Sequence, residues 1–150
     1  MLQLNNYKQM EFYTNIKNSR IPIMNQQEIS LLYGNSYSNI DFIINTPTQF
    51  LTFKLAFKIP SIDLITEDET SQFINTTQKL SKTLDIKCSG YFIGNVKLSD
   101  KAYDILKKTK HFYFCCDSDQ TKLNQKIIKM LYANQLYIFD DSGDCLMIDA

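Results

Sequence analysis

The stretch FLTFKLAFKI, residues 50–59, constrains the fold of this chain most strongly. Apolar side chains occupy every second position, and Thr, Lys, Ala and Lys stand between them. Successive side chains of a β-strand point to opposite faces, so strict alternation predicts a strand that buries one face. Half-buried strands of this kind belong to antiparallel or mixed sheets. Pro60 is expected to end the strand, because proline cannot continue the hydrogen-bonded ladder.

Helix starts occur before and after this strand. Asn25 is a good N-cap, and Glu28 three residues later completes a capping box before a short helix over 26–33. Gly34 can end that helix in a conformation with positive φ. Thr66 and Ser99 are N-caps for two later helices. Two further helices are expected, one near the N-terminus with Tyr7, Met10, Tyr13 and Ile16 in a row, and one over TKLNQKIIKMLYAN, residues 121–134.

Further strands are expected at 40–44, 86–94 and 111–116, and the end of the chain is expected to form a C-terminal β-hairpin that turns at 141–143. Strands alternate with helices, but at least two neighbouring strands look directly connected. The pattern therefore predicts a single α+β domain over residues 1–150. Its sheet is expected to be mixed or mostly antiparallel, with helices packed against it.

Charge and composition exclude several classes of protein. Sixteen basic residues balance sixteen acidic ones, and Arg20 is the one arginine. A domain-wide basic field is absent, so direct binding to nucleic acid is not expected. No apolar run approaches the roughly 18 residues that a membrane span needs, and the start MLQLNNYKQMEF lacks the features of a signal peptide. We therefore expect a cytoplasmic protein without membrane contact, in which four cysteines are free thiols: Cys88, Cys115, Cys116 and Cys145.

The segment HFYFCCDSDQ, residues 111–120, holds the one histidine of the chain and two adjacent cysteines. If 111–116 is a strand, His111 and Cys115 share a face but stand about 13 Å apart. A catalytic Cys–His pair needs its reacting atoms about 3 Å apart. The cysteines also lack the paired spacing of zinc ligands. We therefore expect no catalytic residues, no metal and no cofactor, and a turn after the strand that caps the next helix.

The C-terminal part of the chain is acidic. Residues 111–150 hold six aspartates and three lysines, a local net charge of −3. If the strand at 111–116 lies beside the terminal hairpin, five of these aspartates form one acidic rim, which would suit a basic partner. An ordinary solvated loop surface explains the same residues equally well. The candidate partner-binding residues are Asp117, Asp119, Asp140, Asp141 and Asp144.

The composition is rich in Ile, Asn, Lys, Phe and Tyr, and the segment VKLSDKAYDILKKTKHFYFCC combines a capped helix with an aromatic strand. In these features the chain resembles the immunity proteins of bacterial toxin systems, such as contact-dependent growth inhibition and polymorphic toxins. The resemblance implies a non-catalytic protein that binds and neutralises a cognate toxin domain, for example a nuclease. It transfers no residue roles, because it rests on no specific motif.

Two other classes remain open. One is a structural or adaptor subunit of a phage or bacterial assembly, and the other is a small thiol- or metal-dependent enzyme that uses Cys115 or Cys116. Should the acidic rim not be the interface, Tyr33 and Tyr37 around Gly34 are the next candidates, since tyrosine is a common interface anchor.

Overall fold

The computed structural model describes residues 2–45, 50–56, 64–117 and 119–133. Five strands form one mixed sheet in the order β1-β2-β3-β4-β5. Strand β2 is antiparallel to both of its neighbours, β1 and β3, whereas β3, β4 and β5 are parallel to one another. The strands are β1 (Ile23–Met24), β2 (Phe42–Asn45), β3 (Phe50–Ala56), β4 (Ser89–Gly94) and β5 (Phe112–Cys116).

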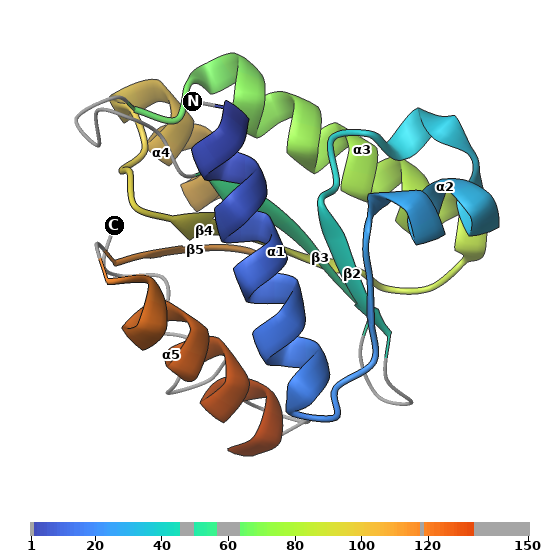
Figure 1. Cartoon of the computed structure of the whole chain (residues 1–150). Helices are drawn as coiled ribbons and strands as arrows, with labels where there is room; N and C mark the ends of the chain where they lie inside the picture. Colours follow the sequence, from blue (N-terminus) through green and yellow to red (C-terminus); the bar gives the residue numbers. More distant parts are fainter. Residues whose placement is uncertain (1, 46–49, 57–63, 118, 134–150) are drawn as a thin grey trace.

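Helices cover both faces of this sheet (Figure 1). They are α1 (Leu2–Asn18), α2 (Gln26–Tyr33), α3 (Glu67–Leu84), α4 (Asp100–Lys108) and α5 (Gln120–Ala133), with a short 3-10 turn, η1 (Asn35–Tyr37), after α2. Helices α1 and α5 contact each other on one face, and α3 and α4 contact each other on the other. The expected α+β class with a mixed sheet is confirmed, whereas the expected C-terminal hairpin lies outside the described residues.

The helix starts expected from the sequence are confirmed. The Asn25 side chain accepts a hydrogen bond from the Glu28 N–H, and the Glu28 carboxylate accepts one from the Asn25 N–H. Thr66 and Glu69 form the same reciprocal pair at the start of α3. Ser99 caps α4 in the simpler way, through the N–H of Ala102. These caps satisfy backbone donors that a helix start otherwise leaves unpaired, which explains why such local signals fix the boundaries.

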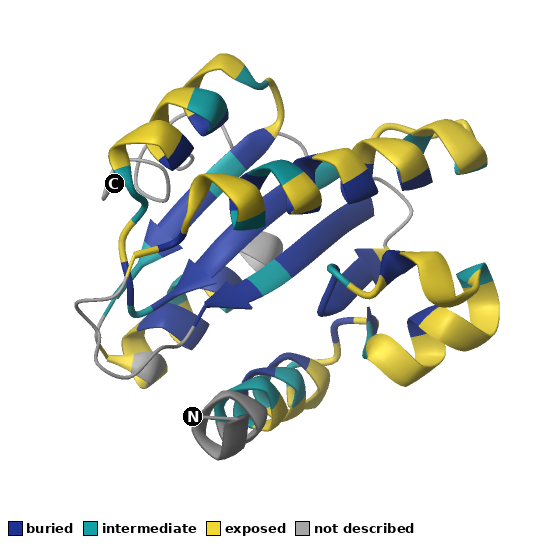
Figure 2. Ribbon diagram, turned by 90° about the horizontal axis from the view of Figure 1, so that it is seen from above, coloured by how far each residue is buried: buried dark blue, intermediate teal, exposed yellow. Residues whose placement is uncertain are grey.

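The prediction that β3 buries one face was wrong. Leu51, Phe53 and Leu55 face the core under α1 and α5, as the alternation indicated. Thr52 and Ala56 on the opposite face are buried as well, and the Thr52 hydroxyl lies 2.9 Å from the Thr77 hydroxyl of α3. Figure 2 shows the buried strands between helices whose outer sides are exposed. The physical reason is the parallel pairing of β3 with β4, because the connecting helix α3 then covers the second face.

The N-terminal helix forms, but its buried face differs from the predicted row. Phe12 and Ile16, four residues apart, are completely buried, whereas Met10 is 69% exposed and Tyr13 is half-buried. A repeat of three residues drifts around a helix of 3.6 residues per turn, and a spacing of four stays closer to one face. No described helix is both long enough and apolar enough to cross a membrane.

The close approach of β3 and β4 generates a stability prediction. Gly94 is paired with Ala56, and a Cβ atom at position 94 would lie 2.1 Å from the carbonyl oxygen of Ala56. Gly94→Ala is therefore expected to lower the free energy of unfolding by about 2–3 kcal/mol in urea titrations, since the backbone must move. The exposed change Gln72→Ala on α3 is the control and should stay within about 0.5 kcal/mol of the native protein. Equal stability of the two variants would contradict this strand packing.

Candidate functional site

A hollow of about 450 Å³ opens between α1, the start of α2 and the start of β2. It combines amide side chains from both helices with one aromatic wall and one carboxylate. Its lining residues are Gln9, Met10, Tyr13, Asn25, Gln26, Gln27, Asp41 and Phe42. The rings of Tyr13 and Phe42 stack with centroids 5.9 Å apart, so this wall joins α1 to the sheet.

Asp41 is the buried carboxylate of this hollow, with 4% of its surface exposed. One of its oxygens, Oδ2, accepts a hydrogen bond of 2.7 Å from the backbone N–H of Leu55 in β3. The other oxygen, Oδ1, accepts a longer bond of 3.4 Å from the amide of Gln26. Gln26 also donates to the carbonyl of Ser38 at 2.8 Å. The carboxylate thus links the first turn of α2 to the central strand β3.

Burial raises the pKa of Asp41 above the usual value of a carboxyl group, while the charge of Lys54 and the hydrogen bond from Leu55 act in the opposite direction. A buried carboxyl group with a raised pKa on the wall of a hollow is a candidate for binding or proton transfer. The Asp41 carboxylate, next to the first residue of β2, also has a structural role, because it accepts the hydrogen bond of a β3 N–H, that of Leu55. The sequence offered one weak signal for it, an aspartate at the start of the apolar stretch IDFII.

A polar network borders the same hollow. The Tyr13 hydroxyl donates to a carboxylate oxygen of Glu28 at 3.2 Å, and the Lys17 ammonium donates to the Tyr13 hydroxyl at 3.1 Å. The hydrogen bond to Tyr13 is the main reason why the pKa of Lys17 is raised. Because Glu28 is also part of the capping box of α2, this network fixes α1 and α2 relative to each other.

Large apolar side chains are exposed on α2 and at the hollow. Leu31 and Leu32 of α2 are 88% and 63% exposed, and Met10 of α1 lines the hollow itself. Leu31 stands four residues after Gln27, so it extends the helix face that borders the hollow. We call Met10, Leu31, Leu32 and the hollow the α1–α2 surface. Adjacent exposed leucines are typical of protein interaction sites.

The tyrosines expected as alternative interface anchors are not exposed. Tyr37 is buried, and Tyr33 is half-buried with its ring against Phe50. The ammonium of Lys79 lies over the ring of Tyr37 at 5.5 Å. The leucines of the same segment, rather than the tyrosines, therefore offer free apolar surface.

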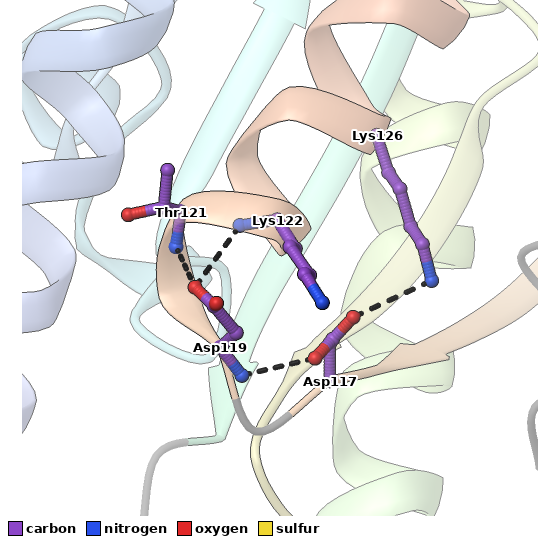
Figure 3. A network of polar contacts seen from close by, with 5 residues as sticks. All are labelled: Asp117, Asp119, Thr121, Lys122 and Lys126. Carbon is purple, nitrogen blue, oxygen red and sulfur yellow. Dashed lines mark hydrogen bonds and ion pairs between the residues drawn. The ribbon is translucent and has the colours of Figure 1, made fainter.

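Two of the five predicted acidic residues are described, and both have local partners (Figure 3). Asp117 follows β5, accepts a hydrogen bond from the Asp119 N–H at 2.9 Å and forms an ion pair of 3.5 Å with Lys126. The bond from Asp119 is the main reason why the pKa of Asp117 is lowered. The Asp119 carboxylate accepts from the backbone N–H groups of Thr121 and Lys122, as expected for a cap of α5. Asp140, Asp141 and Asp144 lie outside the described residues.

The histidine and cysteines are distributed over different parts of the structure. Strand β5 begins at Phe112, and His111 before it has a φ of +70°, so His111 does not continue the strand face of Tyr113 and Cys115 as expected. Cys115 is completely buried under α1 and α5. Burial raises the pKa of the Cys88 thiol, which opposes thiolate formation. Within the described part of the chain, no three His, Cys, Asp or Glu side chains form a metal-binding group.

Comparison with known proteins defines the fold. No protein-family model and no curated protein matches this sequence. Among solved structures, the chain is similar to "Crystal Structure of Protein of Unknown Function AF1548" with a TM-score of 0.54 and 10% sequence identity. The similarity covers 85% of this chain and 65% of the other, so this chain spans about two thirds of that protein. A likeness at this identity shows a shared arrangement of sheet and helices.

The raised pKa of Asp41 predicts a specific dependence of stability on pH. The pKa of Asp41 is higher in the folded than in the unfolded state. The stabilisation that the protonated Asp41 gives to the folded state is therefore fully present below the unfolded-state pKa and is lost as the pH rises through the folded-state pKa. Asp41→Asn keeps the acceptor for Leu55 and cannot ionise. The free energy of unfolding of this variant, measured in urea, should therefore increase relative to the native protein as pH rises above about 4.

The exposed carboxylate Asp104 of α4 provides the matched control, Asp104→Asn, measured over the same pH range. A stability difference between Asp41→Asn and the native protein that does not change with pH would show that Asp41 does not titrate as described.

Proposed function

We propose that this protein is a non-catalytic binding protein of the immunity type, which binds a cognate toxin domain in the cytoplasm and neutralises it. The supporting observation is the α1–α2 surface, where α2 has two exposed leucines, Leu31 and Leu32, and its first turn lines a hollow with a buried carboxylate. Protein interfaces combine an apolar centre with a few placed polar groups, and this surface offers both.

The chemistry of the hollow favours a partner with a protruding basic side chain. Asp41 is the carboxylate of the lining, and the stacked rings of Tyr13 and Phe42 supply an aromatic wall. Glu28 adds a second negative charge nearby, through its hydrogen bond from Tyr13. A lysine or arginine of the partner can bind to both, through a charge-assisted hydrogen bond to a carboxylate and through contact with the aromatic rings. Toxins that act on nucleic acids have basic surfaces, since they must contact phosphates.

The acidic C-terminal residues have a secondary role in this proposal. Asp117 and Asp119 do not line the hollow, and their carboxylates stabilise the turn before α5, where Asp117 also forms an ion pair with Lys126. In the expected terminal hairpin, Asp140, Asp141 and Asp144 would add negative charge that attracts a basic partner over a distance. Charges at the rim of an interface change the association rate more than the final affinity.

The test begins with capture of partners from the native host, using the full chain as bait and mass spectrometry for identification. One stoichiometric partner that maps to the C-terminal region of a large secreted protein is expected. The purified partner domain should lose its own enzymatic activity when one equivalent of this protein is added. A partner that keeps full activity in the complex would contradict the neutralising role.

Substitutions on α2 locate the interface. The double change Leu31→Ser and Leu32→Ser should weaken partner binding at least tenfold in calorimetry, because burial of a leucine side chain contributes about 1.5–3 kcal/mol and a tenfold change corresponds to about 1.4 kcal/mol. Tyr103→Ser on α4 is the matched control, since Tyr103 is also an exposed large apolar side chain, and should bind normally. Normal binding by the α2 variant, together with loss of binding when Asp140, Asp141 and Asp144 are reversed to Lys, would place the interface on the acidic residues instead.

A second candidate function rests on Asp41 alone. A carboxyl group with a raised pKa beside an open hollow suits general acid catalysis, with Lys54 as the nearby cation. This enzyme would not use Cys115, which is completely buried. Turnover of a substrate that Asp41→Asn abolishes would favour it over the binding role. A self-assembling species in solution, measured by light scattering, would favour the structural-subunit alternative.

A further inference from the structure

A second, smaller hollow of about 260 Å³ lies where the connections before β4 and β5 meet the end of α3. It is separate from the α1–α2 surface and shares none of its lining residues. Its lining contains three lysines and the histidine, and no acidic residue. The lining residues are Thr77, Gln78, Ser81, Lys82, Lys87, Cys88, Lys110, His111 and Phe112.

The basic side chains come from three different segments. Lys82 stands in the last turn of α3, Lys87 precedes β4, and Lys110 precedes β5. All three are exposed, and none forms an ion pair with another residue of the described ranges. A lysine in the last turn of a helix compensates the helix dipole, which accounts for Lys82. That explanation does not extend to Lys87 and Lys110, which lie outside any helix.

The loops that carry these side chains are held in place. The Gly90 N–H donates to the His111 carbonyl at 3.0 Å, which joins the start of β4 to the residue before β5. The Ser81 hydroxyl donates to the Ile86 carbonyl, and the Ile86 N–H donates back to the Ser81 carbonyl at 3.1 Å. These bonds fix the connection between α3 and β4. The folded backbone thus places the three lysines around one hollow.

The position of His111 adds to this arrangement. Its φ of +70° is uncommon for a residue other than glycine and costs conformational energy that the surrounding structure must offset. Burial, followed by the charges of Lys87 and Lys110, lowers the pKa of His111. Burial is the larger cause, and the two lysine charges act in the same direction. Like charges that converge without a counter-ion repel, and a bound anion would relieve the repulsion.

We propose that this hollow binds a phosphate group, either as inorganic phosphate or as the phosphate of a small monoester. Lys82, Lys87 and Lys110 would supply the positive charge, and the Gln78 amide a further donor. Lysine binds phosphate as a point charge and needs no planar fork, which fits a chain with a single arginine. The volume suits one phosphate with its waters rather than a whole nucleotide, since sites for larger ligands span roughly 300–1,000 Å³.

The one histidine of the chain reports on this site. Its ring-proton signals in NMR need no assignment, because no other histidine contributes. Inorganic phosphate, titrated at fixed pH and fixed ionic strength, should shift these signals saturably and should raise the pKa of His111. Sodium chloride at the same ionic strength is the control for screening, which also weakens the repulsion from lysines. A shift by phosphate no larger than that by chloride would overturn the proposal.

Variants separate this site from general charge effects. Lys87→Gln and Lys110→Gln should each weaken phosphate binding about tenfold, as expected for loss of one charge-assisted hydrogen bond. Both should also raise the pKa of His111 without phosphate. Lys101→Gln, an exposed lysine at the start of α4 outside this hollow, should change neither quantity.

Repeating the titration with a small phosphate monoester and with a short single-stranded oligonucleotide distinguishes the ligand source. Binding of phosphate or the monoester that is weakened about tenfold in Lys87→Gln supports the proposal. Binding of the oligonucleotide with no response to phosphate or the monoester would overturn it in favour of a nucleic-acid backbone. The titration needs no toxin partner, so its outcome is independent of the proposed function.

Discussion

The structure depends on the burial of β3 on both faces. This strand is the middle of five, antiparallel to β2 and parallel to β4, and helices pack above and below it. Its alternating side chains divide the interior into two cores, one under α1 and α5 and the other under α3 and α4. The bond between Thr52 and Thr77 satisfies the polar atoms that this burial would otherwise leave unpaired.

Coverage of both faces decides where functional surface is available. Helices α1, α3, α4 and α5 pack apolar side chains into the two cores. Helix α2 contributes Ile29 and, in part, Tyr33 to one core, but its Leu31 and Leu32 remain exposed. These exposed leucines lie at the antiparallel side of the sheet, and the first turn of the same helix lines the hollow that holds Asp41. The smaller hollow lined by Lys82, Lys87 and Lys110, which we call the basic hollow, lies instead where the parallel strands β4 and β5 begin. The same topology thus yields two chemically different surfaces.

Local features of the sequence predicted the local structure well. Asn25 with Glu28 and Thr66 with Glu69 mark helix starts because the interacting atoms lie three residues apart. The burial of Thr52 could not be read in this way, because α3 approaches it from 25 residues further along the chain. The sites at Asp41 and at the lysines of the basic hollow were not predicted from the sequence, for the same reason. Their partners belong to other elements, and no short-range spacing signals that they will meet.

Hydrogen exchange of the captured complex tests the central claim most directly. Backbone amides of the full chain would be compared, by mass spectrometry, with and without the partner domain. We expect slower exchange in residues 9–13 of α1 and in residues 25–33, which carry the α1–α2 surface, with little change in α4. Protection confined to the segment after β5, with none in α2, would contradict it.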